Sequence, residues 1–153
     1  MIKNFKVSND IFLIKVIPVK EHENFLYELL KNREKKLSIS HERLPSFYQH
    51  KKFLRSYPYR HWFIIKKGSI LLGATYITKN NCVAIHLLKN NKGLIIKIIS
   101  FIIRTFKPLK ELPSIRRKEF IMNIASNNRL YAEILKQLGG KKVQETFTLK
   151  QTN

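Results

Sequence analysis

The chain has 153 residues, of which 44% are hydrophobic and 26% are charged. This composition excludes a disordered chain, and the length suits one domain with a buried core, which we place over residues 1–153. The single cysteine, Cys82, excludes an internal disulfide and a zinc site built from several thiolates. The N-terminus lacks the apolar run of a signal peptide, and the most apolar segment, 94–106, is too short and too charged to span a bilayer. We therefore expect a cytoplasmic protein without a membrane span.

The chain is strongly basic. It contains 30 Lys and Arg against 10 Asp and Glu, which gives a net charge of +20. Such a field attracts polyanions, including nucleic acids. The basic residues are spread along the chain instead of forming one block, and this favours a solvated basic surface over a nucleic-acid-binding stripe. A basic nucleic-acid-binding module is therefore the third of three functional interpretations, and the charge alone motivates it.

Hydrophobic periodicity and turn residues define the elements in the N-terminal half. Alternating β-branched segments predict strands, and apolar residues at helical spacing predict helices. Pro45 is expected to open the second helix, and turns at Lys67-Gly68 and Asn80-Asn81 predict a three-stranded antiparallel meander. The expected elements are strand 11–19, helix 21–34, loop 35–44, a helix from Pro45 that ends before Pro58, and strands 61–66, 69–78 and 82–88.

Segment 94–106 is ambiguous, because its many isoleucines favour a strand. Its polar residues decide for a helix, since they follow one narrow helical stripe: Lys97, Ser100, Arg104 and Lys107. The remaining expected elements are a strand at 119–125, a helix at 129–138 capped by Asn127 or Asn128 and ended by Gly139-Gly140, and a final strand at 143–149. The order predicts an α/β domain with a mixed, mainly antiparallel sheet and helices on both faces.

The segment from Cys82 to Phe106 is the most informative one, because it predicts a strand, a short turn and a helix. The start of a helix leaves backbone N–H groups unpaired, and the helix dipole adds positive potential there. Lys89 and Lys92 add formal charge at the same turn. The sequence therefore predicts a binding site for a diphosphate at this turn.

Three segments, together with this order of elements, resemble the GNAT N-acetyltransferases over about residues 11–149. Segment 90–95 (Asn-Asn-Lys-Gly-Leu-Ile) stands where the family has its Gln/Arg-x-x-Gly-x-Gly/Ala acetyl-CoA signature. Segment 120–124, followed by Asn128 and by 135–139, is similar to the family's strand, asparagine and helix. Segments 39–45 and 59–65 resemble a bacterial branch associated with modifying amino sugars of surface polysaccharides.

The resemblance implies a GNAT-like fold and acetyl-CoA as co-substrate. The main chain at the end of strand 82–88 would pair with the pantetheine arm, and the N–H groups of 91–95 would hold the pyrophosphate. Lys92 or Lys97 would meet the 3′-phosphate. The coenzyme-binding residues that the resemblance implies are Leu87, Leu88, Asn90, Asn91, Lys92, Gly93, Leu94, Ile95, Asn123 and Asn128.

Two residues are candidates for moving protons as an amine attacks the thioester. His86 stands on the expected strand with its side chain opposite to Ile85, and it is either a base or a packed strand histidine. The family's acid tyrosine falls at Leu135, so Tyr131, one turn earlier, is either the acid or an aromatic packing contact. Cys82 takes the place of the family's usual glutamate.

The expected acceptor is a primary amine of a small molecule, with a nucleotide-linked amino sugar as a candidate. His41, Glu42 and Arg43 fall in the loop where acceptor specificity resides in such enzymes, and Tyr59 and His61 are candidates to stack on a sugar or base. The histidines show no metal-ligand spacing, so no metal is expected. The protein is expected to be a monomer or a homodimer.

The second functional interpretation is a catalytically degenerate protein of the same fold, which binds CoA or a partner without turnover. Its motivation is the set of departures from the family pattern. Ile95 replaces a small residue, Asn90 replaces a longer one, and Cys82 and Leu135 replace the usual base and acid.

Overall fold

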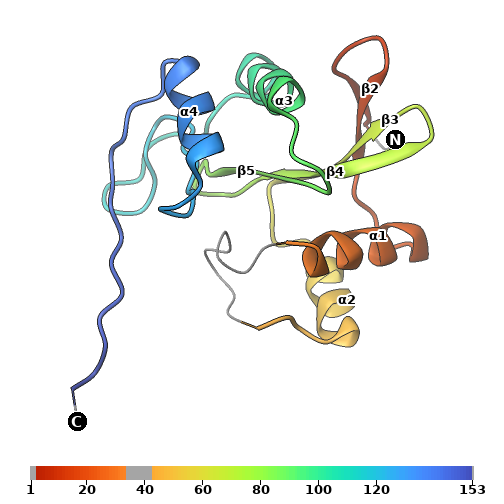
Figure 1. Cartoon of the computed structure of the whole chain (residues 1–153), viewed down its shortest axis with the longest axis horizontal. Helices are drawn as coiled ribbons and strands as arrows, with labels where there is room; N and C mark the ends of the chain where they lie inside the picture. The colour runs from red at the N-terminus through yellow and green to blue at the C-terminus, as the bar shows by residue number, and fades with distance from the viewer. Residues whose placement is uncertain (1–2, 34–42, 153) are drawn as a thin grey trace.

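The computed structural model describes residues 3–33 and 43–152 (Figure 1). Within these residues, five strands form one antiparallel sheet in the order β1-β2-β3-β4-β5, which is also their order along the chain. The elements are β1 (Phe5–Lys6), β2 (Ile11–Lys15), α1 (Lys20–Lys31), α2 (Phe47–Ser56), β3 (His61–Lys67), β4 (Ile70–Ile77), β5 (Val83–Leu87), α3 (Lys92–Thr105) and α4 (Arg129–Gln137). The predicted meander of β3, β4 and β5 is confirmed.

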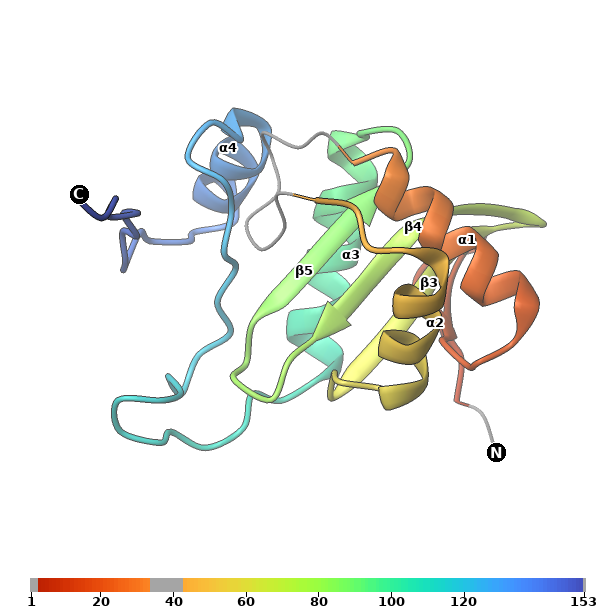
Figure 2. The same cartoon turned by 90° about the horizontal axis from the view of Figure 1, so that it is seen from below.

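The sheet separates two hydrophobic cores, and Figures 1 and 2 show from two directions the helices that lie on either side of it. Helices α3 and α4 cover one face, and α1 and α2 cover the other. Strand β3 contributes to both cores, because Phe63 and Ile65 point to α3 while Trp62 and Ile64 point to α1 and α2. The prediction that helices cover both faces is therefore confirmed.

Segment 94–106, whose sequence was ambiguous between strand and helix, forms most of helix α3, as the polar stripe predicted. Ile95, Ile98 and Ile102 recur at helical spacing and are completely or almost completely buried against the sheet. Lys97 and Arg104 are exposed on the opposite side. The intrinsic strand preference of isoleucine is thus overridden by the apolar face that the helix buries.

Asparagine and serine side chains fix where three helices begin. Ser46 and Gln49 form a reciprocal capping box at α2, so that helix begins just after Pro45. Asn91 caps α3, and Asn128, one of the two predicted candidates, caps α4 by accepting a hydrogen bond from the Tyr131 N–H at 3.3 Å.

Two predicted strands are wrong. Segment 119–125 forms only an isolated parallel bridge, between Ile121 and Cys82, and diverges from β5 beyond it. Segment 143–149 is extended and runs away from the sheet (Figure 1), and it pairs with nothing among the described residues. Phe147 and Leu149 are 79% and 94% exposed. The alternating pattern describes the two faces of a strand, but a ladder also needs a neighbouring edge, which a pattern does not supply.

The long loop 107–119 is fastened to the turn between β4 and β5 by Asn81. This residue is completely buried and has a φ of 62°, a conformation that asparagine tolerates better than most residues. Its Nδ2 donates to the carbonyl oxygens of Leu109 and Arg117 at 2.8 Å each, and its Oδ1 accepts from the Leu109 N–H at 2.7 Å. None of the described helices is both long and apolar enough to cross a membrane.

Candidate active site

The gap between β5 and segment 121–125 forms the first cavity of the site. The Val83 N–H donates to the Ile121 carbonyl at 2.8 Å, and the Ile121 N–H donates to the Asn81 carbonyl at 3.0 Å. Past this point the two segments separate around a cavity of about 160 Å³, which the end of α1 and the start of α4 help to enclose. We call it the splay cavity.

Among the described residues, β5 is the edge strand of the sheet, and its outer edge presents backbone groups to the splay cavity. Since Val83 donates to Ile121 on this side, and backbone groups alternate along a strand, the N–H and C=O of Ile85 and Leu87 face the same side. The Ile85 carbonyl accepts the Tyr131 hydroxyl at 3.1 Å. The Leu88 N–H is directed away, because it donates to the Leu72 carbonyl at 2.9 Å. Leu87 therefore offers the exposed pair of backbone groups.

The start of α3 lies at the open end of β5. The Asn91 side chain accepts from the Leu94 N–H at 2.9 Å, and the Asn91 carbonyl accepts from the Ile95 N–H at 3.0 Å. Among residues 3–33 and 43–152, the N–H groups of Lys92 and Gly93 have no acceptor. Two of the N–H groups predicted for an anion are thus free, and two others are used by the cap.

The side chains of Ile95 and Lys92 are both engaged within the protein. Ile95 is completely buried in the core beneath the sheet, so its branched side chain does not crowd the helix start. Gly93 is exposed, and an added Cβ there would meet only Asn91 Oδ1 at 3.5 Å. The Lys92 Nζ is 2.8 Å from Glu133 Oε1 on α4, while Lys97 is exposed.

Tyr131 is held in the neutral form at the splay cavity. It is buried, and burial raises the pKa of its hydroxyl to about 12. Its proton is directed at the Ile85 carbonyl. The hydroxyl is therefore protonated at neutral pH, and the raised pKa makes it a weaker acid than an exposed tyrosine.

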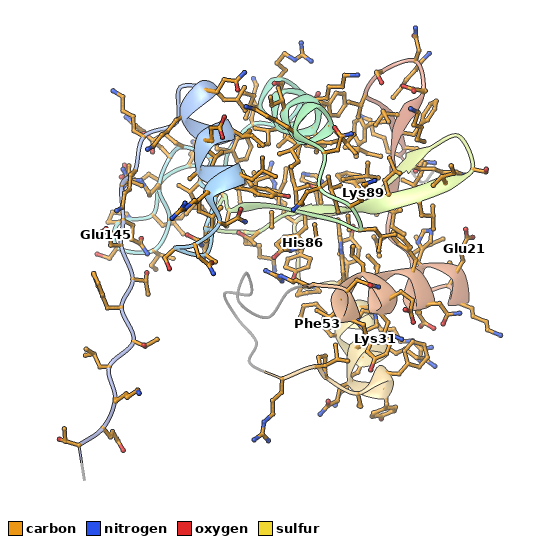
Figure 3. All side chains as sticks on the ribbon, in the orientation of Figure 1. Glu21, Lys31, Phe53, His86, Lys89 and Glu145 are labelled. Carbon is orange, nitrogen blue, oxygen red and sulfur yellow. The ribbon has the colours of Figure 1, made fainter. Side chains whose placement is uncertain are left out.

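His86 lies on the opposite face of β5 from Ile85, as predicted, on the side of α1 and α2 (Figure 3). Its ring centre is 6.0 Å from that of Tyr76. Burial lowers the pKa of the imidazole to about 3, and the positive charge of Arg33 contributes in the same direction. The imidazole is therefore neutral at pH 7 and a weak base in this state.

A second cavity, of about 820 Å³, lies beside the splay cavity. We call it the side cavity. Its walls are β4, β5 and the loop 107–119, and Gln144 of the C-terminal segment also lines it. The rings of Tyr59 and Tyr76 stack there at 3.8 Å with an interplanar angle of 6°. The two cavities share Arg33, Ala84, His86 and Asn123, so they meet at the face of β5 that carries His86.

Among the residues that it describes, the structure brings one of the five predicted acceptor-binding residues to this site. Tyr59 lines the side cavity. His61 lies on the other face of the sheet, where it packs against Phe63 and Phe106, and it lines neither cavity. Arg43 is exposed and also lines neither. His41 and Glu42 lie outside the described residues.

Cys82 and Asn123 meet at the narrow end of the splay. The Asn123 Nδ2 donates to the Cys82 Sγ at 3.5 Å, and burial raises the pKa of the thiol. The thiol is therefore protonated at neutral pH and is not an activated nucleophile. In the part of the chain that the structure describes, no group of three His, Cys, Asp or Glu side chains is placed to hold a metal ion.

Sequence reasoning did not identify three contributors to the site: Arg33, Tyr76 and the loop 107–119. Arg33 follows the last turn of α1, and nothing in its local sequence marks it. Tyr76 was read only as part of a strand. The loop depends on Asn81, whose buried side chain binds residues 28 and 36 positions further along the chain. Only the pair Asn80-Asn81 gave a signal, and it indicated a turn.

No protein-family model matches the chain, and no curated protein matches its sequence. Solved structures share its fold. The RimL ribosomal L7/L12 α-N-protein acetyltransferase in complex with coenzyme A matches with a TM-score of 0.61 and 11% identity, over 88% of this chain and 82% of that chain. A Salmonella typhimurium acetyltransferase that modifies the N-terminal serine of ribosomal protein L7/L12 gives 0.61 and 13%, over 88% and 83%. The microcin C7 self-immunity acetyltransferase MccE, with acetyl-CoA and AMP, gives 0.57 and 13%, over 88% and 81%.

These matches show the fold. The antiparallel sheet with its flanking helices is the GNAT acyl-CoA N-acyltransferase fold, as the sequence predicted. At identities of 11–13% the matches carry no information about individual site residues. The chemistry must therefore be argued from the two cavities themselves.

Proposed function

We propose that this chain is an N-acetyltransferase that moves an acetyl group from acetyl-CoA to a primary amine. The observation that carries the proposal is the splay cavity, where the free edge of β5 leads directly to the uncapped N–H groups of Lys92 and Gly93. A strand edge binds an extended amide chain, and a helix start binds a diphosphate. Pantetheine joined to a pyrophosphate has both features in this order.

The proposed coenzyme position uses main-chain groups. The pantetheine amides would pair with the N–H and C=O of Leu87, and the pyrophosphate would accept from Lys92 and Gly93. Asn128 lines the splay cavity, but its Oδ1 caps α4. Its contribution to the coenzyme would therefore come from Nδ2. The acetyl group would lie where the two cavities meet, beside His86 and Asn123.

The proposed reaction is direct attack of the amine on the thioester. A bond forms between the amine nitrogen and the acetyl carbon as the carbon–sulfur bond breaks, the amine loses a proton, and the CoA thiolate gains one. Tyr131 is the proposed acid, because its hydroxyl keeps its proton and lines the splay cavity. His86 is the proposed acceptor of the amine proton, from its position where the cavities meet.

The acceptor that we propose is a small molecule, with a nucleotide-linked amino sugar as the first candidate. The side cavity has the size of a site for such a ligand, and the stacked rings of Tyr59 and Tyr76 offer an aromatic wall. The amino-sugar assignment rests on the sequence resemblance. The chemistry also allows a protein N-terminus, the substrate type of the two L7/L12 acetyltransferases.

Calorimetric titration with acetyl-CoA tests the proposal, followed by an assay of thiol release over a panel of amines. A Gly93→Asp variant should lose at least about tenfold in affinity, because its carboxylate repels the pyrophosphate. The same charge near the helix start leaves the fold intact or stabilises it. Ser100→Asp adds an equal charge two turns away and serves as the control. Absence of acetyl-CoA binding by the unmodified chain would overturn the proposal.

Binding without turnover would instead support the degenerate alternative. One observation favours it: burial and Arg33 hold the pKa of His86 at about 3, far below that of an effective base at neutral pH. Thiol release with any amine in the panel would exclude this alternative.

A further inference from the structure

The side cavity is positively charged. Four basic side chains and two carboxylates line it: Arg33, Arg116, Arg117 and Lys118, against Glu111 and Glu119. An excess of like charges around a partly enclosed space attracts a ligand of opposite sign. The charge at this site is local, so it carries more information than the net charge of the whole chain.

The basic residues of the loop 107–119 are partly engaged within the protein. Arg116 donates through Nε to the Lys110 carbonyl at 2.7 Å and through a terminal nitrogen to the Lys79 carbonyl at 3.0 Å. These bonds fix the loop. Arg117 Nε lies 3.8 Å from Glu119 Oε2, and both side chains are more than half exposed. They are held at the rim, where water screens them.

Arg33 differs from these residues in position and surroundings. It lines both cavities and is partly buried. Its positive charge lowers the pKa of four aromatic groups that line the cavities. Burial is the main cause of the low pKa of His86, and the positive charge of Arg33 is the second cause. Burial raises the pKa values of three tyrosines, and the Arg33 charge opposes that rise in each: Tyr59, Tyr76 and Tyr131.

We propose that Arg33 is the anion-recognition residue of the acceptor site, and that the acceptor amine carries a phosphate or carboxylate group close to its nitrogen. This inference rests on the proposed function. A guanidinium presents a planar fork of donors that matches both anions in a bidentate manner. Because Arg33 and His86 both lie where the cavities meet, an anion on Arg33 places the adjoining amine beside the imidazole.

Binding of an anion to Arg33 would also make the His86 imidazole a stronger base. A bound anion neutralises the charge that faces His86, so the imidazole of the complex accepts a proton more readily than that of the free protein. An anionic acceptor therefore assists its own deprotonation. A neutral amine makes no such contact with Arg33 and gains neither orientation nor a stronger base.

Matched amine pairs test the proposal. Phosphoethanolamine and ethanolamine differ by a phosphate, and glycine and glycinamide differ by a carboxylate charge. We expect the anionic member of at least one pair to bind at least about tenfold more tightly, by NMR titration of the full chain, and to give higher kcat/KM. The pair that shows the preference identifies phosphate or carboxylate as the recognised group.

Variants of Arg33 test whether this residue causes the preference for the anionic amine. Arg33→Gln should abolish the difference within the pair, whereas Arg33→Lys should keep part of it, because the charge stays and the bidentate fork is lost. Arg104→Gln removes one exposed positive charge from α3, outside both cavities, and should leave the preference unchanged. Circular dichroism confirms that each variant folds.

The outcomes separate this inference from the proposed function. If anionic amines bind through Arg33 while acetyl-CoA does not bind, the inference stands and the acetyltransferase assignment fails. If acetyl-CoA binds and amines turn over without preference for an anionic member, or if Arg33→Gln weakens both members equally, the inference is wrong. Absence of binding by every anionic member would also overturn it.

Discussion

The proposed coenzyme side and the proposed acceptor side of this site are built in different ways. The coenzyme side uses main-chain groups from two elements that follow each other directly, β5 and the start of α3. The acceptor side uses side chains from the end of α1, β4, β5 and the loop 107–119. A site made of main-chain groups tolerates changes of side chain, and Ile95 is buried in the core away from the start of α3. A site made of side chains is more sensitive to substitution, because each side chain is itself a contact.

The largest expected effect comes from removing the Asn81 side chain, which holds the loop 107–119 in place. Asn81→Ala removes three hydrogen bonds of a completely buried side chain and leaves a β-carbon-bearing residue at positive φ. We expect the free energy of unfolding to fall by about 3 kcal/mol in urea denaturation. Amine turnover should fall more than acetyl-CoA affinity. Asn80→Ala, an exposed change in the same turn, is the control for stability, and an equally large fall in its free energy of unfolding would remove the special role of Asn81.

The second effect concerns the proposed acid. Tyr131→Phe removes the hydroxyl that donates to the Ile85 carbonyl but keeps the ring. We expect the rate of thiol release to fall about a hundredfold, with acetyl-CoA affinity changed by about threefold or less and stability lowered by about 1 kcal/mol. Single-turnover kinetics measure the first quantity and calorimetry the second. A wild-type rate in this variant would leave Tyr131 as a packing residue.

The third effect is a pH dependence of stability that originates at His86. Its pKa is about 3 in the folded chain and near 6.5 unfolded, so between these values the unfolded state binds the extra proton. The contribution of neutral His86 to stability is complete above about pH 6.5 and is lost as the pH falls towards 3. Between pH 7 and pH 5, His86→Gln should lose about 2 kcal/mol less stability than the unmodified chain.

Denaturation curves at several pH values measure this difference. Burial also lowers the pKa of His22, His50 and His61, so the unmodified chain has other contributions to the same slope. Subtracting the His86→Gln curve isolates one residue. Identical slopes for the two proteins would show that His86 titrates normally and is not desolvated.

The smallest effect is on the coenzyme side. Asn91→Ala removes the side-chain cap of α3 and should lower the free energy of unfolding by about 1 kcal/mol. It also frees the Leu94 N–H, so acetyl-CoA affinity should change little, in contrast with the loss expected for Gly93→Asp. Calorimetry on both variants compares the two effects. A greater loss of affinity in Asn91→Ala would place the amide side chain itself on the coenzyme.

The sequence predicted correctly those parts of the structure that depend on local periodicity. The polar stripe through Lys97 and Arg104 identified α3, and alternation placed His86 opposite Ile85. The acceptor side depends instead on contacts between distant segments. Arg33 reaches the site through the packing of α1, and the loop 107–119 reaches it through hydrogen bonds that Asn81 and Arg116 make to distant residues. No periodic pattern encodes either. Segment 143–149 shows the opposite case, because its alternating pattern predicted a strand but no neighbouring strand edge is there to pair with it among the described residues.

A structure of the protein with acetyl-CoA bound tests the central claim most directly. The account predicts a pyrophosphate hydrogen-bonded to the N–H groups of Lys92 and Gly93, pantetheine along Leu87, and the thioester beside His86 and Tyr131. Coenzyme bound away from the edge of β5, or a pyrophosphate that contacts neither N–H group, would contradict it.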